Sequence, residues 1–116
     1  MPDPVLYVFG TNDGCFYIGW AEDVHRAFTE MRAGIGSQWI RLHRPSTIVR
    51  VIEDAEGYHE TQLLFEYFKT YGVEKVRGSL YPESVLTPAQ LANIRDALSN
   101  ADESLLESAM KNMVIN

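Results

Sequence analysis

The sequence has little cysteine and no long apolar run, and each shortage excludes a class of protein. Cys15 is the single cysteine among 116 residues, so neither an intrachain disulfide nor a zinc site built from several cysteines is available. No apolar run approaches the roughly 20 residues that a membrane-spanning helix needs, and no basic segment precedes a short apolar one, as in a secretion signal. We therefore expect a cytoplasmic protein, in its own cell or in an infected host, with no membrane partner.

Basic residues are also scarce, and they are unevenly placed. The chain carries 10 Lys and Arg against 16 Asp and Glu, a net charge of −6. Residues 1–50 hold five of each sign, whereas residues 51–116 hold five basic and eleven acidic residues. Because an acidic chain repels phosphate backbones, we expect only weak binding to DNA. The charge argues against an indiscriminate nuclease without excluding a nuclease.

One local basic cluster runs against this trend. Arg41 and Arg44, with His43 and Arg50 close to them in the sequence, are the best candidates for contacts with nucleic-acid phosphates, and a solvated surface is the alternative. Trp39 precedes them and is expected in the core. Stacking on a nucleic-acid base is the alternative for this tryptophan.

Hydrophobic periodicity and turn residues predict an α+β domain. VLYVFG (5–10) and CFYIG (15–19) are rich in β-branched and aromatic residues, and the TNDG sequence between them predicts the turn of a β-hairpin. Helical patterns cover residues 22–33 and 59–72, the first stopped by Gly34 and the second closed by Gly72. The other expected elements are a helical turn within 37–45, a third strand at 47–53, an extended connection at 73–81, and helices at 86–99 and 102–116.

The expected sheet has three strands, antiparallel or mixed, with helices flanking it. We expect one domain over residues 1–100 and a helical tail over residues 101–116 that is not a separate domain. Thr87 and Gln90 predict a capping box for the helix at 86–99, with Pro88 at its first position. The tail is rich in methionine, which favours packing on the domain or the seam of a homodimer.

The helix at 59–72 carries an acid on its apolar stripe. Leu64, Phe68 and Tyr71 follow Glu60 at helical spacing, so the stripe directs the carboxylate toward the interior or a cleft. An exposed glutamate stabilised by the helix dipole is the alternative.

Several motifs of this chain together resemble the GIY-YIG nuclease family. The hairpin carries one tyrosine on each strand, Tyr7 in LYVF and Tyr17 in FYIG, and Gly19 closes the second motif. The further motifs are GSQW (36–39), Pro45 before a strand, an acid opening a helix, YFKTYGVEKVRG (67–78) and LTPAQ (86–90). They are similar to a branch of the family, found in large DNA viruses, phages and some microbes, that has a VRGG-type motif. The similarity extends from about Val5 to about Leu98.

The resemblance implies metal-dependent hydrolysis of phosphodiesters. Tyr7 and Tyr17 would position or deprotonate the attacking water, and Glu60 would bind one Mg²⁺ or Mn²⁺. A family arginine on the helix after the hairpin would contact the scissile phosphate.

Zinc is not expected. The cysteine-rich knuckle that often follows the last helix in this branch is missing. His25, His43 and His59 lack the spacing of metal ligands and are expected on the surface, and no chemistry is assigned to Cys15.

The chain departs from the family pattern at the catalytic helix. Ala27 stands where the family carries the arginine. Arg26 is adjacent, but one residue is a rotation of roughly 100° on a helix, so Arg26 is expected to point away from the cleft. Met31 replaces a histidine usual one turn later, Trp20 occupies a position that is often small or polar, and VRGS (76–79) replaces VRGG.

Two functions from different classes follow. The first is a GIY-YIG-like endonuclease, impaired or inactive because of Ala27, in which Arg26 or Arg41 would replace the missing cation. The second is a pseudo-nuclease that regulates or inhibits another protein, for example a host or defence protein. Such a regulator would use the acidic half or the methionine-rich tail as its binding surface.

Overall fold

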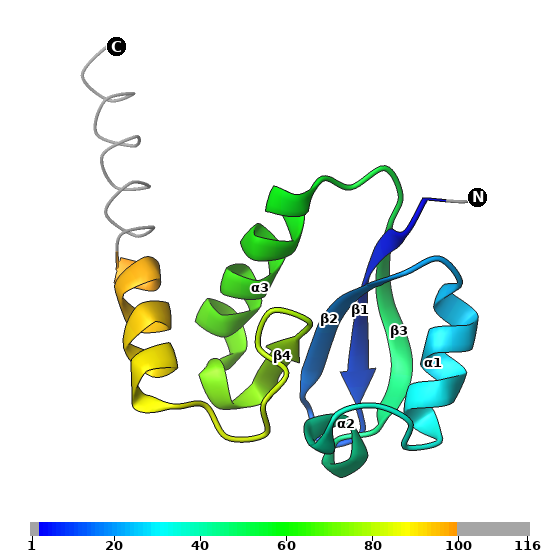
Figure 1. Cartoon of the computed structure of the whole chain (residues 1–116), viewed down its shortest axis with the longest axis horizontal. Coiled ribbons are helices and arrows are strands. Elements are labelled where there is room, and N and C mark those ends of the chain that lie inside the picture. Colours follow the sequence, from blue (N-terminus) through cyan, green and yellow to red (C-terminus); the bar gives the residue numbers. More distant parts are fainter. Residues whose placement is uncertain (1–2, 100–116) are drawn as a thin grey trace. The chain divides into compact units, whose positions relative to one another are not determined.

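A computed structural model of the chain describes residues 3–99, and these form a four-stranded mixed sheet with helices on both sides (Figure 1). The strand order is β3-β1-β2-β4. The strands are β1 (Val5–Thr11), β2 (Phe16–Ala21), β3 (Pro45–Ile52) and β4 (Val76–Gly78). Strand β1 pairs antiparallel with β2 and β3, whereas β4 runs parallel to β2. The α+β class is confirmed.

The expectation of three strands is wrong by one. The fourth strand, β4, lies within the segment 73–81, which we expected to be an extended connection. It has three residues, which is too short to show the alternation that identifies a strand in a sequence. Its pairing of Val76 with Phe16 depends on a partner 60 positions earlier in the chain.

The predicted hairpin is confirmed, and its turn has the chemistry that the sequence indicated. Gly14 has a φ of 79°, in the left-handed region that glycine adopts without steric cost. The Gly14 amide donates to the carbonyl of Thr11 at 3.3 Å, and the Thr11 amide donates to the carbonyl of Cys15 at 3.0 Å. These bonds fix the tight reversal between β1 and β2.

The helices begin at side chains that satisfy their free amide groups. The helices of the sheet domain are α1 (Val24–Arg32), α2 (Gln38–Leu42) and α3 (Gly57–Tyr71), followed by the 3₁₀ turn η1 (Val73–Lys75). The Asp23 carboxylate accepts from the amide of Arg26 at the start of α1, and the Ser37 hydroxyl accepts from the amide of Ile40 in α2. Before α3, the Glu56 amide donates to His59 Nδ1 at 2.7 Å.

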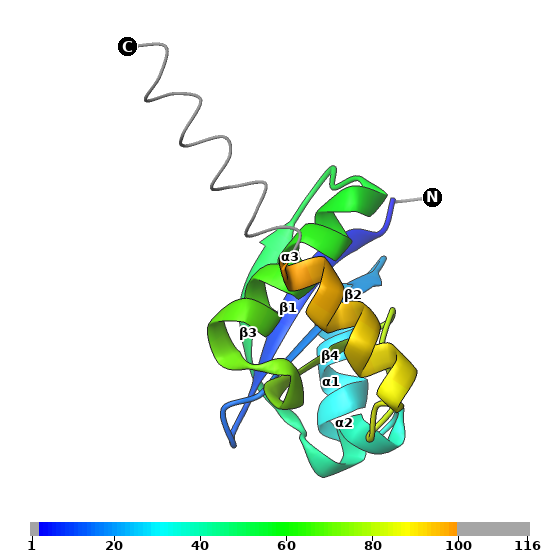
Figure 2. The same ribbon diagram turned by 90° about the vertical axis from the view of Figure 1, so that its left-hand side faces the viewer.

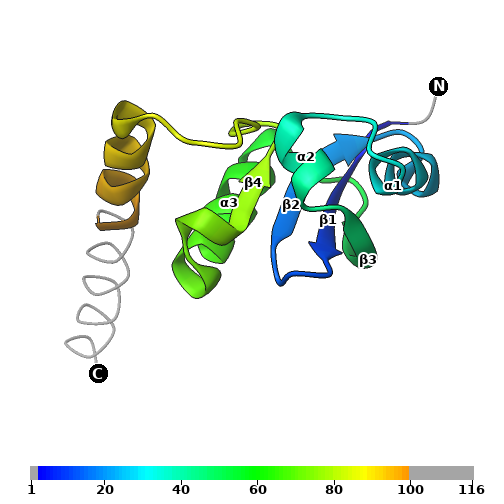
Figure 3. The same ribbon diagram turned by 90° about the horizontal axis from the view of Figure 1, so that it is seen from below.

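The helices cover the two faces of the sheet. Figures 1 and 3 show α1 and α3 on opposite sides of the strands, and Figure 2 views the sheet from the α3 side. On the α1 side, Phe9 meets Phe28 edge to face, with ring centroids 5.2 Å apart. On the α3 side, Phe16 packs on Tyr71 at 4.4 Å. Leu64 and Phe68 are buried as expected, whereas Tyr71 is 48% exposed.

The chain divides into two compact units, residues 1–85 and residues 86–116. In the second unit, the structure describes a helix over residues 88–99. Its predicted capping box is confirmed, because the Gln90 amide donates to Thr87 Oγ1 and the Thr87 amide donates to Gln90 Oε1. The predicted tail at 101–116 lies outside the described residues, and the predicted domain boundary near residue 100 stays a prediction. Within residues 3–99, no helix combines the length and apolar character needed to cross a membrane.

Candidate active site

Tyr7 and Tyr17 lie on neighbouring strands and face the same side of the sheet. Their ring centroids are 6.3 Å apart, and the two residues are 2% and 8% exposed. The Tyr7 hydroxyl donates to the sulfur of Met31 at 3.8 Å. A Cβ added to Gly19, the cross-strand partner of Tyr7, would lie 2.7 Å from the Tyr7 hydroxyl oxygen. The glycine that ends YIG therefore makes room for the hydroxyl of the first tyrosine.

The surroundings of both tyrosines favour the protonated phenol. Burial raises the pKa of Tyr7 above the usual tyrosine value, and the charges of Tyr17 and Glu60 raise it further. Burial also raises the pKa of Tyr17, again with a contribution from Glu60. The negative charge of Glu60 thus adds to burial in disfavouring the ionised form of both phenols.

Glu60 lies in the first turn of α3 and is 8% exposed, so its predicted inward direction is confirmed. Its Oε1 accepts a hydrogen bond from Trp20 Nε1, and its Oε2 accepts one from Ser79 Oγ, both at 2.6 Å. Ser79 follows β4 and is fixed by its own amide, which donates to the Ile18 carbonyl at 3.1 Å. Each carboxylate oxygen therefore already accepts one hydrogen bond from a neutral donor, which leaves fewer lone pairs for a metal ion.

Positions 26 and 27 of α1 face different surroundings. Ala27 is partly buried and packs against the core cluster that contains Tyr7 and Tyr17. Arg26 lies on the outer face of α1, where its side chain is 77% exposed and its Nε donates to Glu30 at 3.1 Å. Ala27 therefore faces the tyrosines and Arg26 does not, because neighbouring residues on a helix point roughly 100° apart.

The three residues predicted as candidates for nucleic-acid binding differ in their exposure to solvent. Trp39 is 1% exposed and lies in the core, with its ring 6.1 Å from Tyr17 and 4.6 Å from His43. Arg41 and Arg44 are exposed. Trp39 is therefore a core residue, as expected, and its ring is not available for stacking on a base. The two arginines are accessible to solvent or to a phosphate.

Arg77 is a buried cation that we did not predict from the sequence. Arg77 is 5% exposed, and its guanidinium donates to the carbonyls of Val73, Val76, Glu83 and Ser84. Burial lowers the pKa of Arg77. The sequence carries no signal for this burial, because β4 is too short to be recognised as a buried strand, inside which an arginine needs several acceptors. Its bonds hold the segment that carries Ser79.

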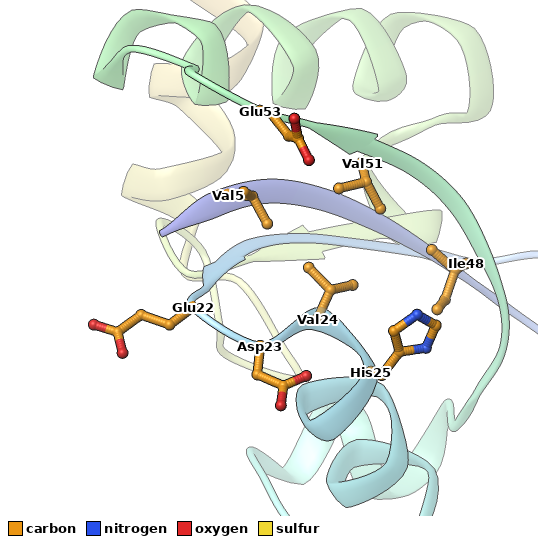
Figure 4. A pocket seen from close by; sticks show the side chains of 8 residues that line it. All are labelled: Val5, Glu22, Asp23, Val24, His25, Ile48, Val51 and Glu53. Carbon is orange, nitrogen blue, oxygen red and sulfur yellow. The ribbon is translucent and has the colours of Figure 1, made fainter. Parts of the chain in front are cut away.

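A surface hollow lies beside the start of α1, apart from the tyrosines (Figure 4). Four apolar residues line it together with the acids Glu22, Asp23 and Glu53, and Figure 4 shows the Glu22 side chain directed away from the apolar residues. The lining residues are Val5, Glu22, Asp23, Val24, His25, Ile48, Val51 and Glu53. The hollow suits a cationic group better than a phosphate, because three acids border it.

The likeness to GIY-YIG nucleases rests on the motifs of this chain alone. No protein-family model matches the sequence, and no curated protein or solved structure matches it either.

Proposed function

We propose that this chain is a GIY-YIG-like domain in which hydrolysis of phosphodiesters is lost or strongly impaired. One observation carries the proposal. Four positions that depart from the family pattern all contact the groups that would perform catalysis, or lie beside them. These positions are Ala27, Met31, Trp20 and Ser79.

The first loss concerns the cation. Ala27 presents a methyl group to the tyrosine side of the sheet, and the adjacent Arg26 is engaged with Glu30 on the outer face. A missing donor to the charge that develops in the transition state costs about 3–4 kcal/mol, or roughly a hundred- to a thousand-fold in rate.

The second loss concerns the base. A general base works best when its pKa lies near the operating pH. Burial raises the pKa of Tyr7 and Tyr17 further above neutral pH, which makes both phenols poorer candidates for a general base. Met31 gives the Tyr7 hydroxyl only a weak sulfur acceptor in place of the family histidine.

The third loss concerns the metal ligand. Trp20 and Ser79 each donate to one oxygen of Glu60. Trp20, at a position that is often small or polar, and Ser79, in place of the second glycine of VRGG, are therefore the two donors to this carboxylate. This coincidence supports a structural role for Glu60 in place of metal binding.

Cleavage of supercoiled DNA, single-stranded DNA and RNA by the purified chain, with Mg²⁺ or Mn²⁺, tests the proposal. A Glu60→Ala preparation made in parallel reveals contaminating nuclease. We expect the two preparations to show the same background. Multiple-turnover cleavage by the natural chain that disappears in Glu60→Ala would overturn the proposal.

A second candidate function is binding of a basic protein partner, and the acid-rimmed hollow favours it. Titration with a lysine-rich peptide, against a glutamate-rich peptide of equal length, measures this binding. The double variant Glu22→Gln/Glu53→Gln should weaken binding of the basic peptide, while Glu66→Gln on the exposed face of α3 should not. Equal affinity for both peptides would exclude this function of the hollow.

A further inference from the structure

We propose that Asp13, Cys15 and His43 form a binding site for a zinc-type divalent transition-metal ion, at the turn between β1 and β2. Within residues 3–99, this is the one group of at least three His, Cys, Asp or Glu side chains placed to share a metal, with ligand atoms within 4.8 Å of one another. No local pattern in the sequence predicts this group, because His43 is 28 positions from Cys15. The proposal does not depend on the proposed function, which involves other residues.

The geometry of the three atoms suits a metal better than a catalytic triad. Cys15 Sγ lies 3.7 Å from His43 Nδ1, and Asp13 Oδ2 lies 2.5 Å from the same nitrogen. A triad needs the nucleophile and the acid on different ring nitrogens. Here Cys15 Sγ and Asp13 Oδ2 both lie near Nδ1 of His43, so the three atoms could share one metal ion.

The distances require only a small adjustment. In a tetrahedral zinc site, ligand bonds of about 2.3 Å to sulfur and about 2.0 Å to nitrogen or oxygen separate sulfur from nitrogen by about 3.6 Å, and nitrogen from oxygen by about 3.3 Å. The observed sulfur–nitrogen separation of 3.7 Å is close to this value, and the sulfur–oxygen separation, which lies within 4.8 Å, would close toward about 3.6 Å. The oxygen of Asp13 would withdraw by less than an ångström, and its side chain is 50% exposed and able to move.

The ligands are held by neighbouring groups. Thr11 Oγ1 donates to Asp13 Oδ1 at 2.5 Å, which leaves Oδ2 turned toward His43. The Cys15 amide donates to the same hydroxyl at 2.9 Å. The His43 ring rests on Trp39, with centroids 4.6 Å apart. Such outer contacts orient metal ligands and raise affinity.

The chemistry of the ligands selects the ion. A thiolate and an imidazole favour Zn²⁺ and its neighbours over Mg²⁺, which prefers oxygen. One carboxylate and one thiolate together balance a divalent charge. Binding releases the Cys15 thiol proton to the buffer, and the imidazole keeps one proton, on Nε2. The half-buried His43 and the exposed Asp13 leave the fourth position to water.

Titration of the reduced full chain with Co²⁺ tests this site. We expect one Co²⁺ per chain and a thiolate-to-cobalt charge-transfer band that one equivalent of Zn²⁺ removes and an excess of Mg²⁺ does not. Cys15→Ala should lose the band. Loss of a residue that only hydrogen-bonds a metal ligand lowers metal affinity roughly 10- to 100-fold. Asp13→Asn and His43→Gln each remove a ligand itself, so we expect them to weaken Zn²⁺ binding by at least this factor.

Two further variants control for effects that do not depend on the proposed metal site. His25→Gln removes a histidine outside the cluster and should bind Zn²⁺ as the natural chain does. Because Cys15 is 3% exposed, Cys15→Ala could fail to fold, and then the exposed Asp13→Asn decides. The absence of a charge-transfer band in the natural chain would overturn the proposal. So would an unchanged Zn²⁺ affinity in Asp13→Asn, or an equal loss in His25→Gln.

Discussion

The indole Nε1 of Trp20 donates a hydrogen bond to Oε1 of Glu60, with 2.6 Å between the two atoms. Trp20 belongs to β2 and Glu60 to the first turn of α3, so the bond joins the sheet to the helix that covers one of its faces. A buried carboxylate is costly unless it is hydrogen-bonded. Trp20 and Ser79 meet this requirement with neutral groups, which makes Glu60 part of the packing between β2, α3 and the segment after β4.

Removal of either donor should destabilise the domain. Trp20→Phe and Ser79→Ala each delete a hydrogen bond to a charged group, for which we expect about 1.5–3 kcal/mol of unfolding free energy. Ser84→Ala removes a neutral bond to Gln38 at 3.3 Å and should cost less. Urea unfolding of the three variants measures the difference.

A double-mutant cycle with Glu60→Leu separates the bond from the packing of the indole. Trp20→Phe should cost less in the Glu60→Leu background, because no buried carboxylate is then left without a donor. Strictly additive costs would show that Trp20 contributes only through its ring, and that the carboxylate finds another donor.

The local features of this fold could be predicted from the sequence, whereas the contacts of Glu60 could not. Alternation, turn residues and caps predict the hairpin, the helices and the box formed by Thr87 and Gln90, since these depend on neighbours within a few positions. The stripe of α3 predicts that Glu60 points inward. Its donors, however, lie 40 and 19 positions away. They can be recognised only after β4 has paired with β2, and β4 itself is too short to be predicted.

Two departures from the GIY-YIG pattern could be noticed in the sequence but not interpreted, for the same physical reason. Trp20 and the serine of VRGS stand out one by one in the sequence. Their common partner depends on the parallel pairing that places Gly78 opposite Ile18. The cluster of Asp13, Cys15 and His43 likewise depends on α2 ending beside the hairpin turn.

Substituting the residues of the GIY-YIG pattern into this chain should produce cleavage of DNA only when several positions are changed together. Ala27→Arg alone returns a cation to the tyrosine side, but Glu60 stays occupied by Trp20 and Ser79. We expect Ala27→Arg/Trp20→Ser/Ser79→Gly to show Mg²⁺- or Mn²⁺-dependent cleavage of DNA that Ala27→Arg alone does not show, because only the triple variant also removes the two donors to Glu60. Single-turnover cleavage by the folded variants measures it.

Glu60→Ala added to the triple variant is the control, and it should remove the gained activity. Circular dichroism establishes that each variant is folded before it is assayed. A folded triple variant without any Glu60-dependent cleavage would mean that the site has lost more than these three groups, and would weaken the relation to the nuclease family.

The buried tyrosines predict a loss of stability at high pH. Burial raises the pKa of Tyr7 and Tyr17 in the folded state, while in the unfolded chain they titrate near the usual value of about 10. The unfolded state therefore loses protons first as the pH rises. The stabilisation is complete below about pH 10 and falls above it, by at most about 1.4 kcal/mol per pH unit for each tyrosine.

Urea unfolding between pH 8 and pH 11 measures this slope. Tyr7→Phe should reduce it, because one of the two buried phenols is then absent. Tyr58→Phe, at a position 60% exposed, serves as the control for the loss of a hydroxyl. A slope that is unchanged in Tyr7→Phe would show that the Tyr7 phenol ionises as easily in the folded protein as in the unfolded chain.

The glycine of VRG should be the least replaceable glycine of the sheet. A Cβ added to Gly78 would lie 2.4 Å from the carbonyl oxygen of Ile18, a backbone atom that cannot move without breaking the pairing of β4 with β2. Gly78→Ala should therefore cost more than the roughly 1–3 kcal/mol of ordinary overpacking. It should also release Ser79 from Glu60. Gly57→Ala, at the first turn of α3 with open space around the new methyl group, should instead leave stability unchanged or raise it by about 0.4–1 kcal/mol. Unfolding midpoints of the two variants, measured beside the natural chain, decide between these outcomes, and a Gly78→Ala protein as stable as Gly57→Ala would show that β4 is not held against β2 in solution.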